Sequence, residues 1–215
     1  MKLYTFFRSS ASYRVRIAMN LKGLPYEPEL IHLSKDGGGQ NQPAFRQLNP
    51  QGLLPVLIDD DGHTLTQSLA ILEYLEELHP ETPLLPPDAL GRAQVRSIAL
   101  AISCDIHPIN NLRVLQYLGG TLGQNEEQRN TWYRHWTESG LNALETMLVQ
   151  SGKAGKFCHG DTPTLADCCL VPQMFNAKRF ECDLSKIPTL VRINDACLQL
   201  EAFAKASPPQ QPDAQ

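Results

Sequence analysis

The chain has 215 residues, of which 42% are hydrophobic, and its formal net charge is -4. This length suffices for one large domain or two small ones, each with its own core. The 19 lysines and arginines do not exceed the 23 acidic residues, so no basic excess is available to bind a nucleic-acid backbone. No apolar run approaches the roughly 20 residues that span a bilayer, and the N-terminus lacks a signal-peptide pattern. We therefore expect a cytoplasmic protein without nucleic-acid or membrane partners.

The six cysteines include no CxxC pair, and the adjacent Cys168 and Cys169 are poorly placed to bridge to each other. Isolated cysteines of this kind are typical of small buried side chains in a reducing compartment. Neither a disulfide framework nor a metal site is expected. If thiol chemistry takes place here, we expect a ligand to supply the thiol.

The first 80 residues alternate between strand-like and helix-like patterns. Strand-like runs lie at residues 2–7, 26–33, 55–59 and 63–65, and helical spacing marks residues 12–22, 43–48 and 67–78. A strand-helix-strand unit favours parallel strands, whereas the tight turn at Asp60-Asp61-Gly62 favours an antiparallel pair. The sequence therefore predicts a small mixed sheet with helices on its faces.

The second part of the chain is helical after a proline-rich linker. HPETPLLPP, residues 79–87, contains four prolines and cannot continue a helix. We therefore divide the chain into a domain at residues 1–80, a linker at 81–89 and a helical domain at 90–215. Helical runs are expected at residues 90–118, 125–150, 165–181 and 188–205. Thr164 and Asp167 form a capping box at the third of these, and the tail SPPQQPDAQ is expected to fray or to lie over the surface.

Three local patterns suit an anionic or peptide-like ligand. In Arg8–Arg14 a strand ends and a helix begins, so a serine can cap the helix while the first turn attracts an anion. At Leu54-Pro55, a proline after a cis bond would turn the main chain of Leu54 toward an extended ligand. At Gln67-Ser68, a hydroxyl and amides at a helix start suit a carboxylate. Taken singly, each is also compatible with a plain helix cap or a trans proline.

The order and spacing of these patterns are more specific than any one of them. The segments SSASYRVRIA, NPQGLLPVL, QSLAILEYLEE and GDTPTLADCCLVPQ resemble the zeta class of glutathione S-transferases, and the resemblance covers residues 2–205. It implies a thioredoxin-like N-terminal domain with a mixed four-stranded sheet, followed by an all-helical C-terminal domain. It also implies glutathione as cofactor and a homodimer. Members commonly have a cysteine where this chain has Ala11, so a second thiol near the site is absent.

Members of this class isomerise maleylacetoacetate or maleylpyruvate in aromatic catabolism. Both are diacids with a cis double bond conjugated to a carbonyl, and reversible addition of a thiolate removes the barrier to rotation. A free thiol with a pKa near 8.5 is only about 3% ionised at pH 7, so the enzyme must lower that pKa. It must also hold two carboxylates, for which arginine offers a matching fork of donors.

The resemblance implies roles for individual residues. Catalysis is assigned to Ser9, Ser10 and Arg8, with the Ser9 hydroxyl facing the glutathione sulfur. The residues expected to contact glutathione are Ser9, Ser10, Ser12, Arg14, Gln40, Leu54, Pro55, Gln67, Ser68, His107, Asn111 and Arg113. The arginines expected to bind the substrate carboxylates are Arg8, Arg113 and Arg179. Tyr4 and Tyr13 are alternative hydroxyls for the thiol, and His107 is an alternative proton donor.

Two other functions fit the same residues. A transferase or dehalogenase would use the same thiolate against electrophilic halides, and an apolar pocket would favour it. A non-catalytic glutathione-binding protein would not need a hydroxyl that faces the thiol. The diacid-binding arginines favour the isomerase.

Overall fold

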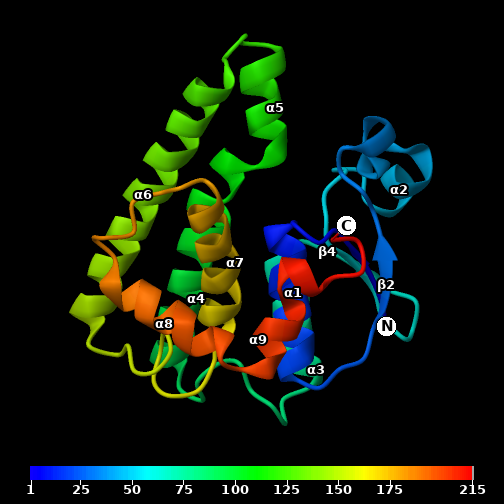
Figure 1. Ribbon diagram of the computed structural model, residues 1–215. Coiled ribbons are helices and arrows are strands. Elements are labelled where there is room, and N and C mark those ends of the chain that lie inside the picture. Colours follow the sequence, from blue (N-terminus) through cyan, green and yellow to red (C-terminus); the bar gives the residue numbers. More distant parts are fainter. Residues whose placement is uncertain (215) are drawn as a thin grey trace. The chain divides into compact units, whose positions relative to one another are not determined.

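The computed structural model describes residues 1–214, which form two compact units. The first contains Met1–Leu84 together with the chain from Leu198 on, and the second is Leu85–Cys197. The expected helical domain extended to residue 215, but the last segment joins the first unit. It does so because α9 (Glu201–Ala206) packs along α1 (Ser10–Leu21), as the red and blue helices of Figure 1 show.

The first unit is built on a four-stranded mixed sheet, as predicted. Its strands are β1 (Lys2–Thr5), β2 (Glu27–Leu30), β3 (Val56–Ile58) and β4 (Thr64–Thr66), in the order β2-β1-β3-β4. β1 pairs parallel with β2 and antiparallel with β3, and β3 pairs antiparallel with β4. The parallel pair encloses α1 as its crossover, and the antiparallel pair closes on the predicted Asp-Asp-Gly turn.

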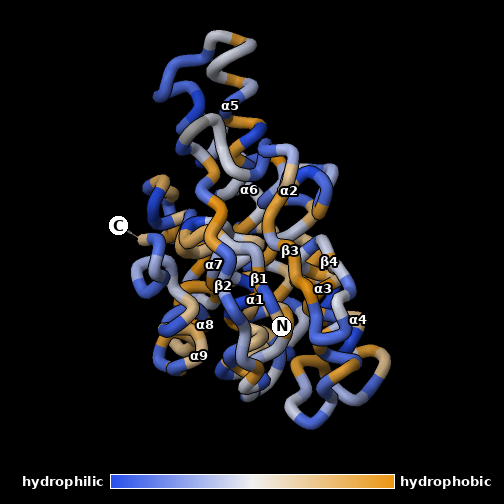
Figure 2. The backbone as a smooth tube through the Cα atoms, turned by 90° about the vertical axis from the view of Figure 1, so that its right-hand side faces the viewer, coloured by the Kyte–Doolittle hydropathy of each residue, from blue (hydrophilic) through white to orange (hydrophobic). Residues whose placement is uncertain are grey.

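Helices α1, α2 (Pro43–Leu48) and α3 (Ser68–Leu78) complete this unit with α9. Leu3 and Leu57 face each other across β1 and β3, and both are fully buried. β3 is hydrophobic throughout its length (Figure 2). α1 is enclosed more completely than its pattern predicted, because every residue of 13–19 is buried, two arginines included. α1 is therefore the central helix of the unit.

The second unit is helical. Its helices are α4 (Ala89–Leu100), α5 (Leu112–Gly120), α6 (Glu126–Ser151), α7 (Leu165–Arg179) and α8 (Pro188–Leu198). The helix expected over residues 90–118 is broken, because a π-helical segment, Ala101–Ile106, leads into Pro108, which lacks an N–H to continue the ladder. The helix expected over 188–205 is also two helices, separated by the extended backbone of Leu200. The capping box of Thr164 and Asp167 at the start of α7 is confirmed. Among the described residues, no helix has the length and apolar character needed to cross a membrane.

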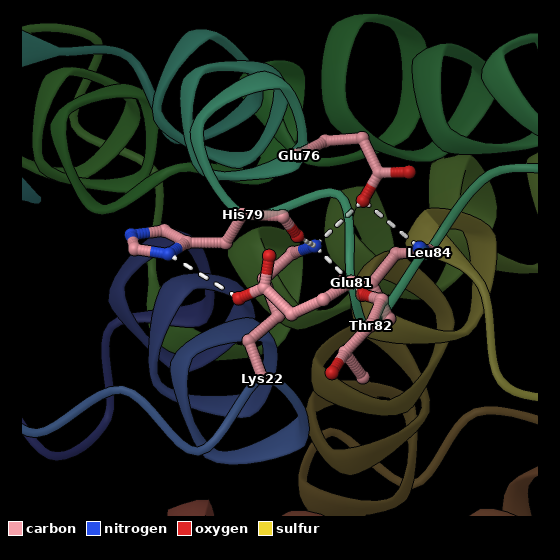
Figure 3. Close-up of polar contacts among 6 residues, drawn as sticks. All are labelled: Lys22, Glu76, His79, Glu81, Thr82 and Leu84. Atoms are coloured by element: carbon pink, nitrogen blue, oxygen red, sulfur yellow. Dashed lines mark hydrogen bonds and ion pairs between the residues drawn. The ribbon is translucent and has the colours of Figure 1, made fainter.

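A buried ion pair fixes the start of the linker to the first unit (Figure 3). The Lys22 side chain has no exposed surface, and its ammonium donates to Glu76 Oε2 at 2.8 Å, to the His79 carbonyl at 2.9 Å and to the Thr82 carbonyl at 2.8 Å. The same Glu76 oxygen accepts the N–H of Leu84 at 2.9 Å. The ends of α1 and α3 are thereby joined to residues 79–84, so the first unit extends to Leu84.

Replacing Lys22 by methionine should lower the free energy of unfolding by about 3–5 kcal/mol, because the Glu76 carboxylate is left buried without its cation. Adding Glu76→Met should recover part of that loss. Lys205→Met, which breaks the exposed pair with Glu201, is the control and should cost less than about 1 kcal/mol. Urea titrations of the three variants check this, and a loss as small for Lys22→Met as for Lys205→Met would contradict it.

Candidate active site

Ser9 lies at the junction of β1 and α1, where the first predicted pattern placed it. β1 ends at Thr5, a turn follows, and the Ser9 N–H donates to the Phe6 carbonyl at 3.0 Å. Ser9 is the N-cap of α1, and its Oγ accepts the N–H of Ser12 at 3.2 Å. Ser10 is the first helical residue and is buried. No acidic side chain lies in this first turn, so none competes with an external anion for the positive end of the helix.

The hydroxyl of Ser9 is held in one orientation by Ser12. Ser12 Oγ donates to Ser9 Oγ at 3.1 Å, in addition to the bond from the Ser12 N–H. A serine hydroxyl has two lone pairs and one hydrogen. Because Ser12 uses both lone pairs, the Ser9 hydrogen remains for a ligand. Ser12 itself has no exposed surface, so we interpret its expected ligand contact as support of Ser9.

Arg8 precedes Ser9 and is exposed. Its Cζ lies 4.8 Å from the centroid of the Phe7 ring and 5.8 Å from that of Phe6. A guanidinium over an aromatic face is restrained while its N–H edge can still bind a carboxylate.

Arg14 joins α1 to the start of α3. Its side chain is 2% exposed, and Nη1 donates to Ser68 Oγ at 3.2 Å. Ser68 is the first residue of α3 and is also buried. The expected ligand contact of Arg14 stays a prediction, and its bond to Ser68 adds a supporting role at the start of α3. Ser9 and Ser68, the serines of the first and third patterns, thus each accept a hydrogen bond from a side chain of α1.

The start of α3 lacks the side-chain cap that α4, α5 and α6 have, which leaves its N–H groups open to an anion. Asp88, Asn111 and Asn125 cap α4, α5 and α6 with their side chains, whereas Gln67 makes no such bond to α3. Gln67 also has a φ of 67°, a conformation that costs a non-glycine residue of order 1–3 kcal/mol. Strain of this kind at a helix start that lacks its cap is typical of a ligand site.

Gln51 is a further candidate site residue, which the sequence did not predict. Its Oε1 accepts from Gln67 Nε2 at 2.8 Å and so orients the strained residue. Gln51 lies in the quoted NPQGLLPVL segment, but nothing local in that segment predicts a partner sixteen positions later.

The main chain at Leu54 is available to an extended ligand. The Leu54-Pro55 peptide is cis, as the second pattern allowed. Asn49 shapes the preceding turn, because its Nδ2 donates to the Leu53 carbonyl at 2.8 Å and its Oδ1 accepts the Gln51 N–H at 3.1 Å. Among the described residues, no hydrogen bond uses the N–H or the C=O of Leu54.

Gln40 lies in the glycine-rich loop after β2 and is 9% exposed. Its Nε2 donates to the Leu33 carbonyl at 3.1 Å. Its Oε1 is buried and has no hydrogen-bond partner in the described part of the chain. One end of the amide therefore supports the loop, and the other is an unused acceptor.

Four predicted site residues lie in the second unit, His107, Asn111 and Arg113 in one stretch and Arg179 in another. His107 ends the π-helical segment, its N–H donating to the Ile102 carbonyl at 2.9 Å. Asn111 caps α5 by accepting the N–H of Arg113 at 3.2 Å, which gives it a structural role beside the expected one.

Arg179 ends α7 and is exposed. Its Cζ lies 4.6 Å from the centroid of the Phe180 ring. Arg8 and Arg179 therefore share one arrangement, in which an exposed guanidinium lies over the aromatic ring of an adjacent phenylalanine.

One group of side chains resembles a cation site but is explained by the β3–β4 turn. Asp59, Asp61 and His63 bring ligand atoms within 4.8 Å of one another. Asp59 Oδ2 already accepts from Tyr74 Oη at 2.6 Å and pairs with His63 Nδ1 at 3.0 Å, and its Oδ1 accepts the His63 N–H. Hydrogen bonds from Tyr74 and His63 hold the pKa of Asp59 well below its ordinary value. The cluster closes the turn.

Comparisons with known proteins show the family and the fold of the chain. The family model for the glutathione S-transferase N-terminal domain matches residues 3–83. The maleylpyruvate isomerase of a Ralstonia species is 49% identical over 214 residues, which cover 100% of both chains. A holo structure of maleylpyruvate isomerase, described as a bacterial zeta-class glutathione S-transferase, has a TM-score of 0.96 at 49% identity and full coverage of both chains. The maleylacetoacetate isomerase of Methylobacterium extorquens, solved with malonate and glutathione bound, has a TM-score of 0.95 at 43% identity and the same coverage.

Proposed function

The chain belongs to the zeta class of glutathione S-transferases, and we propose that it is a glutathione-dependent cis–trans isomerase of maleylacetoacetate or maleylpyruvate. Relatives at 43% and 49% identity over their full length carry these two activities in their names. Among the residues of this chain, the observation that supports the proposal most strongly is the Ser9 hydroxyl, whose hydrogen remains for a ligand.

The residues of the first unit fit glutathione, a tripeptide with two carboxylates and a thiol. The open start of α3 suits a carboxylate, and the main chain of Leu54 suits the peptide. The helix start at Ser9 suits the sulfur, because it offers a hydroxyl hydrogen and the positive end of a helix. The bound cofactor would supply a thiolate that adds reversibly to the cis double bond.

Ser9 would donate its hydrogen to the sulfur and so favour the charged form of the thiol. A neutral donor stabilises the anion without adding a permanent charge beside it. Arg8 and Arg179 would bind the two carboxylates of the substrate through paired N–H groups, with Arg113 as a further candidate. The phenylalanine ring beneath Arg8 and the one beneath Arg179 limit the motion of each guanidinium, which lowers the entropic cost of orienting it toward a carboxylate.

We further propose that the protein is a cytoplasmic homodimer. All six cysteines are free and five are buried, which fits a reducing compartment. Leu90, Leu100, Leu112 and Tyr117, on the first helices of the second unit, are exposed apolar side chains that suit a seam between copies. Sedimentation at micromolar concentration should give twice the 24.0 kDa of one chain, whereas a 24.0 kDa species would refute the dimer.

Ser9→Ala should raise the pKa of the bound glutathione thiol by about one to two pH units, because a hydrogen bond to a charged group contributes roughly 1.5–3 kcal/mol. Ser10→Ala should raise it less. Ultraviolet absorbance of the thiolate, titrated against pH in the binary complex, measures this, and kcat should fall with the thiolate fraction.

The control for Ser9→Ala is Asn125→Ala, which also removes a helix cap, at the start of α6. Both variants should lose about 1 kcal/mol of stability, but only the first should move the thiol pKa. A thiol pKa unchanged by Ser9→Ala would remove Ser9 from the mechanism.

Arg8→Met and Arg179→Met should spare glutathione binding but lower kcat/KM for the diacid about 10- to 150-fold, mainly through KM. Conjugation of a neutral halide should change little, because such a substrate has no carboxylate to lose. Lysine at either position should recover only part of the loss, since an ammonium offers no planar fork.

Arg192→Met is the matched control, because Arg192 is an exposed arginine of α8 that donates to the Gly155 carbonyl. It should leave kcat/KM for both substrates unchanged. Equal losses on the diacid and the neutral halide in the Arg8 and Arg179 variants would mean that these arginines do not bind the substrate carboxylates.

A further inference from the structure

The C-terminal segment belongs to the first unit, and its tail was expected either to fray or to lie over the surface. α9 lies along α1 (Figure 1), where Asn20 Nδ2 donates to the Ala202 carbonyl at 3.0 Å and Tyr13 Oη donates to the Phe203 carbonyl at 3.4 Å. A short 3₁₀ turn, Pro208–Gln210, then leads toward Asp213. We call residues 201–214 the C-terminal strap.

Arg16 connects this strap to the turn that precedes Ser9. Its guanidinium is fully buried, and Nε donates to the Ala206 carbonyl of the strap at 3.0 Å. Nη1 donates to Thr5 Oγ1 at 2.9 Å and to the Phe6 carbonyl at 3.3 Å, and Nη2 donates to the Phe7 carbonyl at 3.0 Å. One buried cation thus contacts the end of β1, two residues of the turn (Phe6 and Phe7) and the strap.

Asp213 reaches the same turn from the other end of the chain. Its Oδ2 accepts the N–H of Phe7 at 3.0 Å. Its Oδ1 is buried and has no hydrogen-bond partner among the residues that the structure describes. The negative charge of Asp213 is close enough to Arg16 to favour the charged form of that guanidinium.

These contacts use the polar main-chain groups of the turn immediately before Ser9. The Phe6 carbonyl accepts from both Ser9 N–H and Arg16, and both polar groups of Phe7 are used, one by Arg16 and one by Asp213. Arg8 and Ser9 follow directly. The position of Ser9 therefore depends on side chains that lie outside the site and, for Asp213, more than 200 residues away in the sequence.

We propose that Asp213, acting through Phe7, is a positioning residue for Ser9, and that Arg16 and the C-terminal strap complete its support. This inference rests on the proposed role of Ser9 toward the glutathione thiol. When the Asp213 contact is lost, the turn gains freedom, and the Ser9 hydrogen is less often directed at the sulfur. Glutathione still binds, because the start of α3 and the main chain at Leu54 are unaffected.

The experiment compares full-length Asp213→Ala, Asp213→Asn and Glu201→Ala with the unaltered protein. Asn keeps an oxygen acceptor for the Phe7 N–H, and Glu201 is an exposed carboxylate of the same strap that pairs with Lys205. Asp213→Ala should raise the pKa of the bound thiol and lower kcat roughly 3- to 30-fold, with glutathione affinity changed less than about threefold. Asp213→Asn should restore most of both values, and Glu201→Ala should match the unaltered protein.

The thiol pKa separates positioning from damage to the fold, because a smaller folded fraction lowers kcat without moving the pKa of the complexes that remain. A thiol pKa in Asp213→Ala equal to that of the unaltered protein would overturn the inference, as would an Asn variant as impaired as the Ala variant. Failure of the unaltered protein to bind glutathione, measured by calorimetry, would instead overturn the proposed function itself.

Discussion

The guanidinium of Arg16 has no exposed surface, and the geometry of the turn before Ser9 follows from that constraint. A buried charge is costly unless hydrogen bonds surround it. The acceptors around Arg16 are Thr5 Oγ1 and the carbonyls of Phe6, Phe7 and Ala206. Burial lowers the pKa of Arg16 to about 10, so the side chain is still charged near neutral pH. The last residues of β1, the turn and the strap are thus arranged around one cation.

α1 presents a second buried arginine in a different direction. Arg14 donates to Ser68 at the start of α3, whereas Arg16 faces the turn and the strap. Two positions along an α-helix separate side chains by about 200°, so neighbouring arginines can serve opposite sides of one helix. The starts of α1 and α3, which suit a ligand, are therefore both held by side chains of α1. In this view Ser9 and Ser68 face the ligand, and the buried polar residues of α1 hold them in place.

The parts of this structure that the sequence predicted are those with local causes. The capping box at Thr164, the Asp-Asp-Gly turn and the serine at the start of α1 each follow from a few adjacent residues, and the mixed sheet follows from the order of such elements. The contacts of the strap were not predictable in this way, although a helix was expected as far as residue 205 and the tail was expected to fray or to lie over the surface. The strap is held by Arg16 and Phe7, which are about 190 and 206 positions away from their partners in the sequence.

Burial also decided which residues of the serine motif face outward. The sequence places Ser9, Ser10, Ser12 and Arg14 together, and the family resemblance assigned all four to the ligand. The packing of α1 buries Ser12 and Arg14, and their hydrogen bonds lead us to interpret them as supports of Ser9 and Ser68. The break at Ala101–Ile106 is a similar case, since helical spacing continues across it and Pro108 alone marks its end.

If the Ser9 site serves an isomerisation, glutathione is needed but not consumed. The most direct measurement incubates the protein with a large excess of maleylpyruvate or maleylacetoacetate over glutathione, and follows the trans product and the free thiol together. An isomerase forms many molecules of trans product per molecule of glutathione, and the thiol concentration is unchanged at the end. Loss of one thiol for each diacid converted, with a stable thioether as product, would instead show a conjugating transferase and rule out the isomerase.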